Sequence, residues 1–262
     1  MTVRNSFKAA LVAVSVLGLS ACGGGEPVDP AMFDAEVQRL ADDGDLYGEI
    51  FLVLKDTRPA LYNEFRTIAV NEFSRGRPTR EASFVAGMQM REKFLSEILR
   101  LSRVASDENI KEMIAVMIET YTHLNAENPA DCVRSIEGLT PEKVEEYPPA
   151  LRKRELQLIV SLLSDEKTTL NRRAASQKEV LNWMVNMISV EPQVGDMLRL
   201  LEAEKRGRAD DETICNGMIT VYKRLSYKTA EKRGPLFRGM ALLALQQQQL
   251  QRLENAEDDV AT

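Results

Sequence analysis

Along most of the chain, apolar residues recur every three or four positions, which is the period of an α-helix that buries one face. The clearest stripe follows Ser106, which is expected to cap a helix whose first turn is acidic. Further stripes predict helices over residues 84–99, 156–163, 180–188, 197–204, 214–225 and 236–253. Sustained β-strand alternation is absent from the sequence. The pattern predicts an all-α fold of roughly nine or ten helices.

Glycine, proline and capping residues indicate where helices begin and end. Gly44 is expected to end one helix and Asp45 to cap the next. Two cap-plus-proline pairs, Asn128-Pro129 and Thr140-Pro141, predict short helices in the middle of the chain.

The length of the periodic region sets the expected domain organisation. We expect a single compact domain over residues 33–253, with the segment 138–149 as an alternative boundary between two helical halves. Residues 254–262 are acidic and poor in large apolar side chains, so they are expected to form a disordered tail.

The N-terminus shows a different pattern. Arg4 and Lys8 precede an apolar run that is shorter than the roughly 20 residues needed to span a bilayer. The run ends in Leu-Ser-Ala-Cys, residues 19–22, which resembles the lipobox of bacterial lipoproteins. The resemblance covers the targeting segment alone. It implies that residues 1–21 are a signal peptide and that the thiol of Cys22 receives a diacylglycerol.

This resemblance also implies a location. Residues 22–32 would form the lipidated cysteine and a flexible tether, rich in glycine and proline. Gly23 stands where the inner-membrane retention signal of such proteins usually has Asp. We therefore expect a lipid anchor on the extracytoplasmic side of a bacterial membrane, with the outer membrane, facing the periplasm, favoured if the cell has one. Loss of residues 1–21 removes two basic residues and no acid, and changes the formal charge from −6 to −8.

Composition excludes several classes of protein. With 44% hydrophobic and 28% charged residues, the chain is neither wholly disordered nor collagen-like. A net charge of −6 without a long basic block argues against nucleic acid as the main partner.

Cys132 and Cys215 remain once Cys22 is lipidated, and each is expected on the apolar side of a helix. Outside the cytoplasm two such thiols favour a disulfide, which would stabilise the fold by on the order of 4–5 kcal/mol in the chain-entropy model. Two separate buried thiols are the alternative.

Residues with catalytic or metal-binding chemistry are few. His123 is the only histidine, and helical spacing places it on a polar face one turn after Glu119. The segment Asp42-Asp43-Gly44-Asp45 lacks the ligand spacing of an EF-hand. We therefore expect no metal, no cofactor and no catalytic residue. An enzyme that uses two distant carboxylates stays open.

Two surfaces are candidates for binding. The basic runs at residues 152–154 and 172–173 are expected to be solvated or to contact anionic lipid or cell-wall polymer. Leu242 and Leu245 lie away from the main apolar stripe of the last helix. Either that helix is central and packed on all sides, or these two leucines dock an unknown envelope protein.

Three functions remain open. The favoured one is a non-enzymatic, lipid-anchored envelope protein that binds a protein partner or supports the envelope. The alternatives are a helical module that binds a small molecule or lipid, and a hydrolase that uses carboxylates alone.

Overall fold

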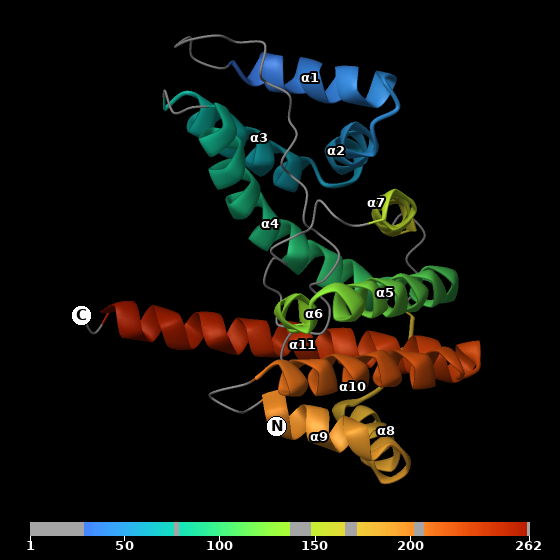
Figure 1. Cartoon of the computed structure of the whole chain (residues 1–262). Coiled ribbons are helices and arrows are strands. Elements are labelled where there is room, and N and C mark those ends of the chain that lie inside the picture. Colours follow the sequence, from blue (N-terminus) through green and yellow to red (C-terminus); the bar gives the residue numbers. More distant parts are fainter. Residues whose placement is uncertain (1–28, 76–78, 137–147, 166–171, 202–206, 261–262) are drawn as a thin grey trace. The chain divides into compact units, whose positions relative to one another are not determined.

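A computed structural model of the chain describes residues 29–75, 79–136, 148–165, 172–201 and 207–260 (Figure 1). Every regular element in these ranges is a helix, which confirms the all-α prediction. The helices are α1 (Pro30–Asp42), α2 (Leu46–Thr57), α3 (Pro59–Phe73), α4 (Thr79–Val104), α5 (Asp107–Glu127), α6 (Pro129–Ile136), α7 (Pro149–Asp165), α8 (Gln177–Val190), α9 (Pro192–Leu201), α10 (Arg208–Ser226) and α11 (Ala230–Val260). These eleven exceed the expected nine or ten. One break that the apolar pattern did not indicate lies at Arg58, directly before the N-terminal proline of α3.

Local capping chemistry accounts for several helix boundaries. Gly44 has a φ of +76°, a conformation that glycine adopts without strain, and it separates α1 from α2. An Asp45 carboxylate oxygen then accepts a hydrogen bond from the backbone N–H of Tyr47 at 2.8 Å. The Ser106 hydroxyl accepts from the N–H of Asn109 at 3.2 Å and caps α5. All three features agree with the sequence-based predictions.

The C-terminal helix is longer than expected. α11 begins at Ala230 rather than near residue 236, and it continues to Val260. Residues 254–260 are therefore helical in the structure, where the sequence indicated a disordered tail. The reason is that residues 240–260 contain no glycine or proline and are rich in Ala, Leu, Gln and Glu, which are strong helix formers. The predicted boundary at Thr140-Pro141 lies outside the described residues.

Packing groups the described helices into two compact units. One unit contains residues 29–98 and 152–165, and so includes α1, α2 and α3 with most of α4 and α7. The other unit contains the end of α4 together with α5, α6 and α8 to α11. Along the described chain, the unit changes after residues 98 and 151 and again between residues 165 and 172. The change after residue 151 lies close to the alternative boundary expected at 138–149.

The unit that contains α1 has an aromatic core. Five aromatic rings meet edge to face or tilted, with centroids 5.7 to 6.5 Å apart: Phe33, Phe51, Tyr62, Phe65 and Phe94. Such pairs add about 0.5–1.5 kcal/mol each beyond the apolar area that they bury. The core of this unit therefore rests on rings from α1, α2, α3 and α4.

The unit that contains α11 is organised around α10. This helix packs against α5, α6, α9 and α11. Tyr222 and Leu225 on α10 are fully buried. A Cβ atom at Gly217 would collide with Met197 of α9, so glycine allows the two helices to approach closely. None of the described helices is both long enough and apolar enough to cross a membrane.

Candidate functional site

A disulfide joins Cys132 of α6 to Cys215 of α10, with the two Cα atoms 6.0 Å apart. Both residues are fully buried. The bond closes a separation of 83 residues along the chain and connects two helices that both pack against α5. The predicted pairing is thus present, and the alternative of two separate thiols is not.

The other predicted site residues fall into different environments. Cys22 lies outside the described residues, so lipidation stays a prediction. Leu242 and Leu245 are half-buried. The buried residues of α11 include five in a row, Phe237, Arg238, Gly239, Met240 and Ala241, so the helix is enclosed on all sides there. This burial supports the interpretation of α11 as a central helix over residues 237–241, directly before Leu242. Docking of a partner at Leu242 and Leu245 stays a prediction.

The candidate metal and acid–base residues are dispersed. His123 is half-buried and Glu119 is exposed on α5. Asp45 of the acidic segment serves as the cap of α2. Among the described residues, no group of three or more His, Cys, Asp or Glu side chains is placed to hold a metal ion.

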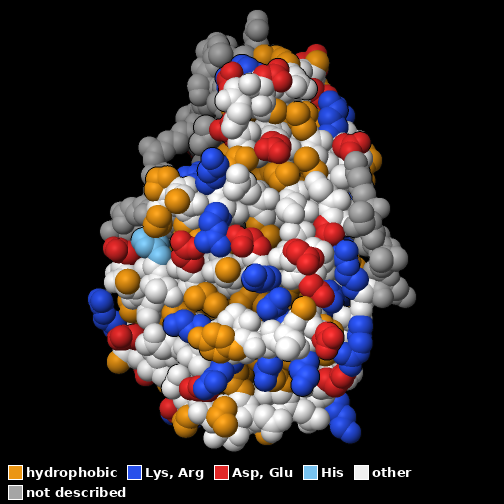
Figure 2. Space-filling view, turned by 90° about the vertical axis from the view of Figure 1, so that its right-hand side faces the viewer, with side chains coloured by type: hydrophobic (Ala, Val, Ile, Leu, Met, Phe, Trp, Pro, Cys, Tyr) orange, Lys and Arg blue, Asp and Glu red, His pale blue; other side chains and the backbone are white. Residues whose placement is uncertain are grey.

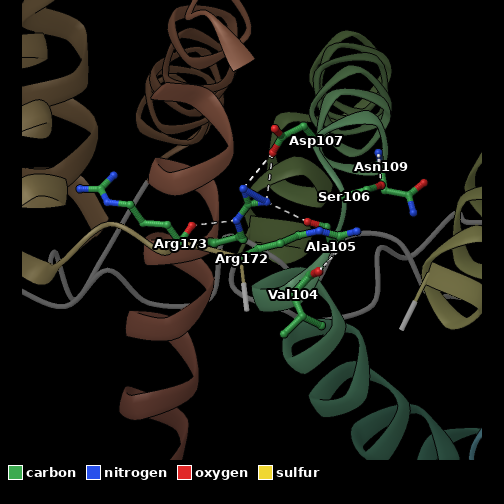
Figure 3. A network of polar contacts seen from close by, with 8 residues as sticks. Val104, Ala105, Ser106, Asp107, Asn109, Arg172 and Arg173 are labelled. Atoms are coloured by element: carbon green, nitrogen blue, oxygen red, sulfur yellow. Dashed lines mark hydrogen bonds and ion pairs between the residues drawn. The ribbon is translucent and has the colours of Figure 1, made fainter. Parts of the chain in front are cut away.

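Arg238 on α11 is 4% exposed and forms several polar contacts. Its partners Ala105, Asp107 and Arg173 are labelled in Figure 3. Its guanidinium donates to the carbonyl of Ala105 at 2.8 Å, to that of Arg173 at 3.0 Å, and to the Asp107 carboxylate at 2.8 and 3.1 Å. The Arg172 guanidinium donates to the carbonyl of Val104 at 2.6 Å. The carbonyls of Val104 and Ala105 lie at and directly after the end of α4, where a helix leaves its last C=O groups unpaired and favours positive charge. The cluster therefore holds the α4–α5 corner in place.

The two predicted basic runs take part in folding contacts. Besides the bond of Arg172, the Arg173 side chain forms an ion pair with Glu179 of α8. In the other run, the Arg152 guanidinium donates to the Tyr47 hydroxyl at 2.8 Å and lies over its ring. Arg152 and Arg172 are thus half-buried and engaged within the protein, whereas Lys153 and Arg173 are exposed, as the sequence indicated.

A second polar cluster surrounds Asp34 on α1. The Tyr62 hydroxyl donates to the Asp34 carboxylate at 2.7 Å, and the cations of Arg66 and Lys55 lie 3.2 and 3.5 Å from it. Partial burial acts to raise the pKa of Asp34, but the hydrogen bond and the two cations outweigh it and lower that pKa. Burial and the same carboxylate raise the pKa of Tyr62. Asp34 therefore stays ionised and links α1, α2 and α3.

Exposed apolar side chains gather on α8. Its buried side carries Val180 and Met187, and the helix packs against α9 and α11. Leu181 and Val185, one turn apart, are 37% and 62% exposed, and we call them the α8 outer face. The exposed residues of α8 around it are Gln177, Lys178, Asn182 and Ser189, of which only Lys178 is charged.

A basic segment connects α10 to α11. Residues 223–233 read KRLSYKTAEKR, with five basic residues and one acid, and we call this segment the basic turn. The sequence interpretation overlooked it because the bases are interrupted by Leu225, Ser226 and Tyr227. Counting charge over an eleven-residue window would have found it.

No protein-family model, curated protein or solved structure matches this chain.

Proposed function

We propose that the protein is a lipid-anchored component of the bacterial envelope that binds a protein partner through the α8 outer face. The lipobox-like residues 19–22 support the anchor. The exposed pair Leu181 and Val185 is the observation that supports partner binding. We infer an interaction surface here because the two apolar side chains are adjacent and face solvent on a helix that already buries another face.

The surroundings of this pair define the chemistry of the partner. Among the exposed α8 residues beside this pair, amide and hydroxyl groups predominate and Lys178 carries the one charge. A matching surface would present apolar side chains ringed by uncharged hydrogen-bonding groups, as the centre and rim of protein interfaces do.

The size of the face predicts how tightly the partner binds. α8 has 14 residues and is therefore about 21 Å long. One face of such a helix is smaller than the roughly 800 Å² per partner of a stable complex. We expect transient binding, and this small area also argues against a stable dimer of two copies through α8 alone.

The test is covalent trapping in cells that express the full chain. A photo-cross-linking amino acid replaces Asn182 beside the α8 outer face, and the mass of the adduct is measured with and without Val185→Asp. We expect one saturable adduct, and at least a tenfold loss of it in the Val185→Asp chain. Folding should change little, because Val185 is mostly exposed.

Asn186→Asp is the matched control. It introduces the same negative charge at the residue after Val185, which points about 100° away from Val185 around the helix axis. It should keep the adduct. Equal adduct yields from all three chains would show that the α8 outer face does not bind a partner. An adduct of twice the mass of the chain would identify a second copy as the occupant.

A further inference from the structure

The basic turn is positively charged although the chain as a whole is acidic. Residues 223–233 carry a formal charge of +4, whereas the full chain carries −6. The turn lies at the right of Figure 1, where α10 ends and α11 begins, and therefore faces the viewer in Figure 2. Lys and Arg side chains are frequent on the lower half of that face, with acidic ones among them.

Hydrogen bonds hold the turn in a defined shape. The N–H of Lys228 donates to the carbonyl of Leu225 at 3.1 Å, and the N–H of Arg233 donates to that of Thr229 at 2.8 Å. The Arg233 guanidinium reaches back to the carbonyls of Ser226 and Lys228. Tyr227 stands between the two helices with 76% of its surface exposed. The ring is thus presented to solvent from a capped, ordered turn.

Stabilisation of the helices explains only part of this charge. Lys223 and Arg224 lie in the last turn of α10, where the helix dipole favours cations. Lys232 lies in the first turn of α11, where the dipole disfavours them. Arg224 pairs with Glu191. In the part of the chain that the structure describes, Lys223, Lys228 and Lys232 form no ion pair, and all three are exposed.

We propose that the basic turn docks on an anionic phospholipid surface, with the Tyr227 ring among the headgroups and the three lysines on the phosphates. This inference rests on the proposed function, because a lipid anchor brings the chain to a membrane. A tyrosine has an apolar body and a polar tip, which suits a boundary between hydrocarbon and water. A dissolved polyanion offers charge but no apolar layer for the ring. The exposed tyrosine therefore favours lipid.

The experiment reads the environment of residue 227 directly. The full chain carries Tyr227→Trp together with Trp183→Phe, so that its one tryptophan is the probe. Its fluorescence is measured with vesicles of phosphatidylcholine alone and with vesicles containing 30% phosphatidylglycerol, each with brominated acyl chains as quenchers. We expect a blue shift and quenching with the anionic vesicles only, and their loss in 1 M salt, where charges are screened within about 3 Å.

A variant that lacks the three exposed lysines tests whether their charge drives the docking. Each lysine near an anionic surface contributes roughly fivefold to binding, so Lys223→Gln, Lys228→Gln and Lys232→Gln together should weaken docking on the order of 100-fold. The matched control removes three exposed bases elsewhere in the same unit, through Arg103→Gln, Lys111→Gln and Arg208→Gln. It should dock as the parent probe chain does.

Anchoring and docking are separated by adding Cys22→Ser to the probe chain. If the chain is not lipidated but the basic turn does dock, anionic vesicles still quench the tryptophan, both in the probe chain and in the probe chain that carries Cys22→Ser. Equal quenching by zwitterionic vesicles, or unchanged quenching in the three-lysine variant, would overturn the proposal. So would an emission change with polyphosphate but none with anionic vesicles, because the turn would then bind a soluble polyanion.

Discussion

At the scale of single residues, Arg238 shows how one side chain can satisfy distant parts of the backbone. It contacts Asp107, which is 131 positions away in the sequence, and the carbonyls of Ala105 and Arg173. Glycine makes room for the cluster, since a Cβ atom at Gly234 would collide with the Asp107 carboxylate. The charge is buried but well hydrogen-bonded, which is the condition under which proteins tolerate buried charges.

Arg238→Met should lower the free energy of unfolding by about 2–4 kcal/mol, because the buried carbonyl of Ala105 and the part-buried carbonyl of Arg173 lose their charged donor. Chemical denaturation measures the change. Arg199→Met is the control, since Arg199 is 73% exposed in a surface pair with Asp196 and such pairs contribute about 1 kcal/mol or less. Similar losses in the two variants would show that the Arg238 cluster adds no stability of its own.

At the scale of elements, α10 is the helix on which much of its unit depends. It packs against four other helices and is bonded to α6 through Cys132 and Cys215. α6 has only eight residues, and an isolated helix of that length is not stable in water. The disulfide and the contact with α5 therefore hold α6 in its position.

Reducing the disulfide, or replacing it by Cys132→Ala with Cys215→Ala, should lower the free energy of unfolding by roughly 2–5 kcal/mol. The physical reason is that the reduced unfolded chain regains the freedom of the long loop between the cysteines. Thermal unfolding with and without reductant measures the loss, and the double variant should show no further effect of reductant. Rapid alkylation of both thiols in native protein before any reduction would contradict the bonded state.

At the scale of the whole molecule, the proposed anchor determines where every surface acts. A single acyl chain binds a membrane only marginally, whereas several chains, at about 0.8 kcal/mol per buried CH₂, hold a protein there stably. The α8 outer face would then meet its partner, and the basic turn its lipids, at high local concentration. Transient contacts suffice under that condition, because tethering raises the effective concentration of both surfaces.

Cys22→Ser should leave an unprocessed or soluble chain, because the hydroxyl is a far weaker nucleophile than the thiolate that accepts the lipid. Fractionation of membranes and measurement of the mature mass give the result, with Cys215→Ser as a control that keeps the lipobox-like residues. If the Cys22→Ser chain matures and partitions with membranes like the parent, the lipid anchor is absent.

The sequence by itself determined the features that depend on near neighbours in the chain. The helical period, the caps at Asp45 and Ser106, and the proline at the start of α6 are all set within about four residues, so they could be predicted. The disulfide could be anticipated from the number of cysteines and the expected compartment, but the sequence did not exclude two separate buried thiols. The extension of α11 to Val260 was also a local matter, and the acidic composition of residues 254–262 concealed it.

Only the tertiary structure decided which predicted faces are covered. The runs containing Arg152 and Arg172 looked free in the sequence and are engaged by Tyr47 and Val104. Leu181 belonged to the predicted apolar stripe of residues 180–188 and is 37% exposed on α8. Burial depends on which helices pack together, and those contacts join residues far apart in the chain. Periodicity identifies an apolar face, but only packing shows whether another helix lies against it.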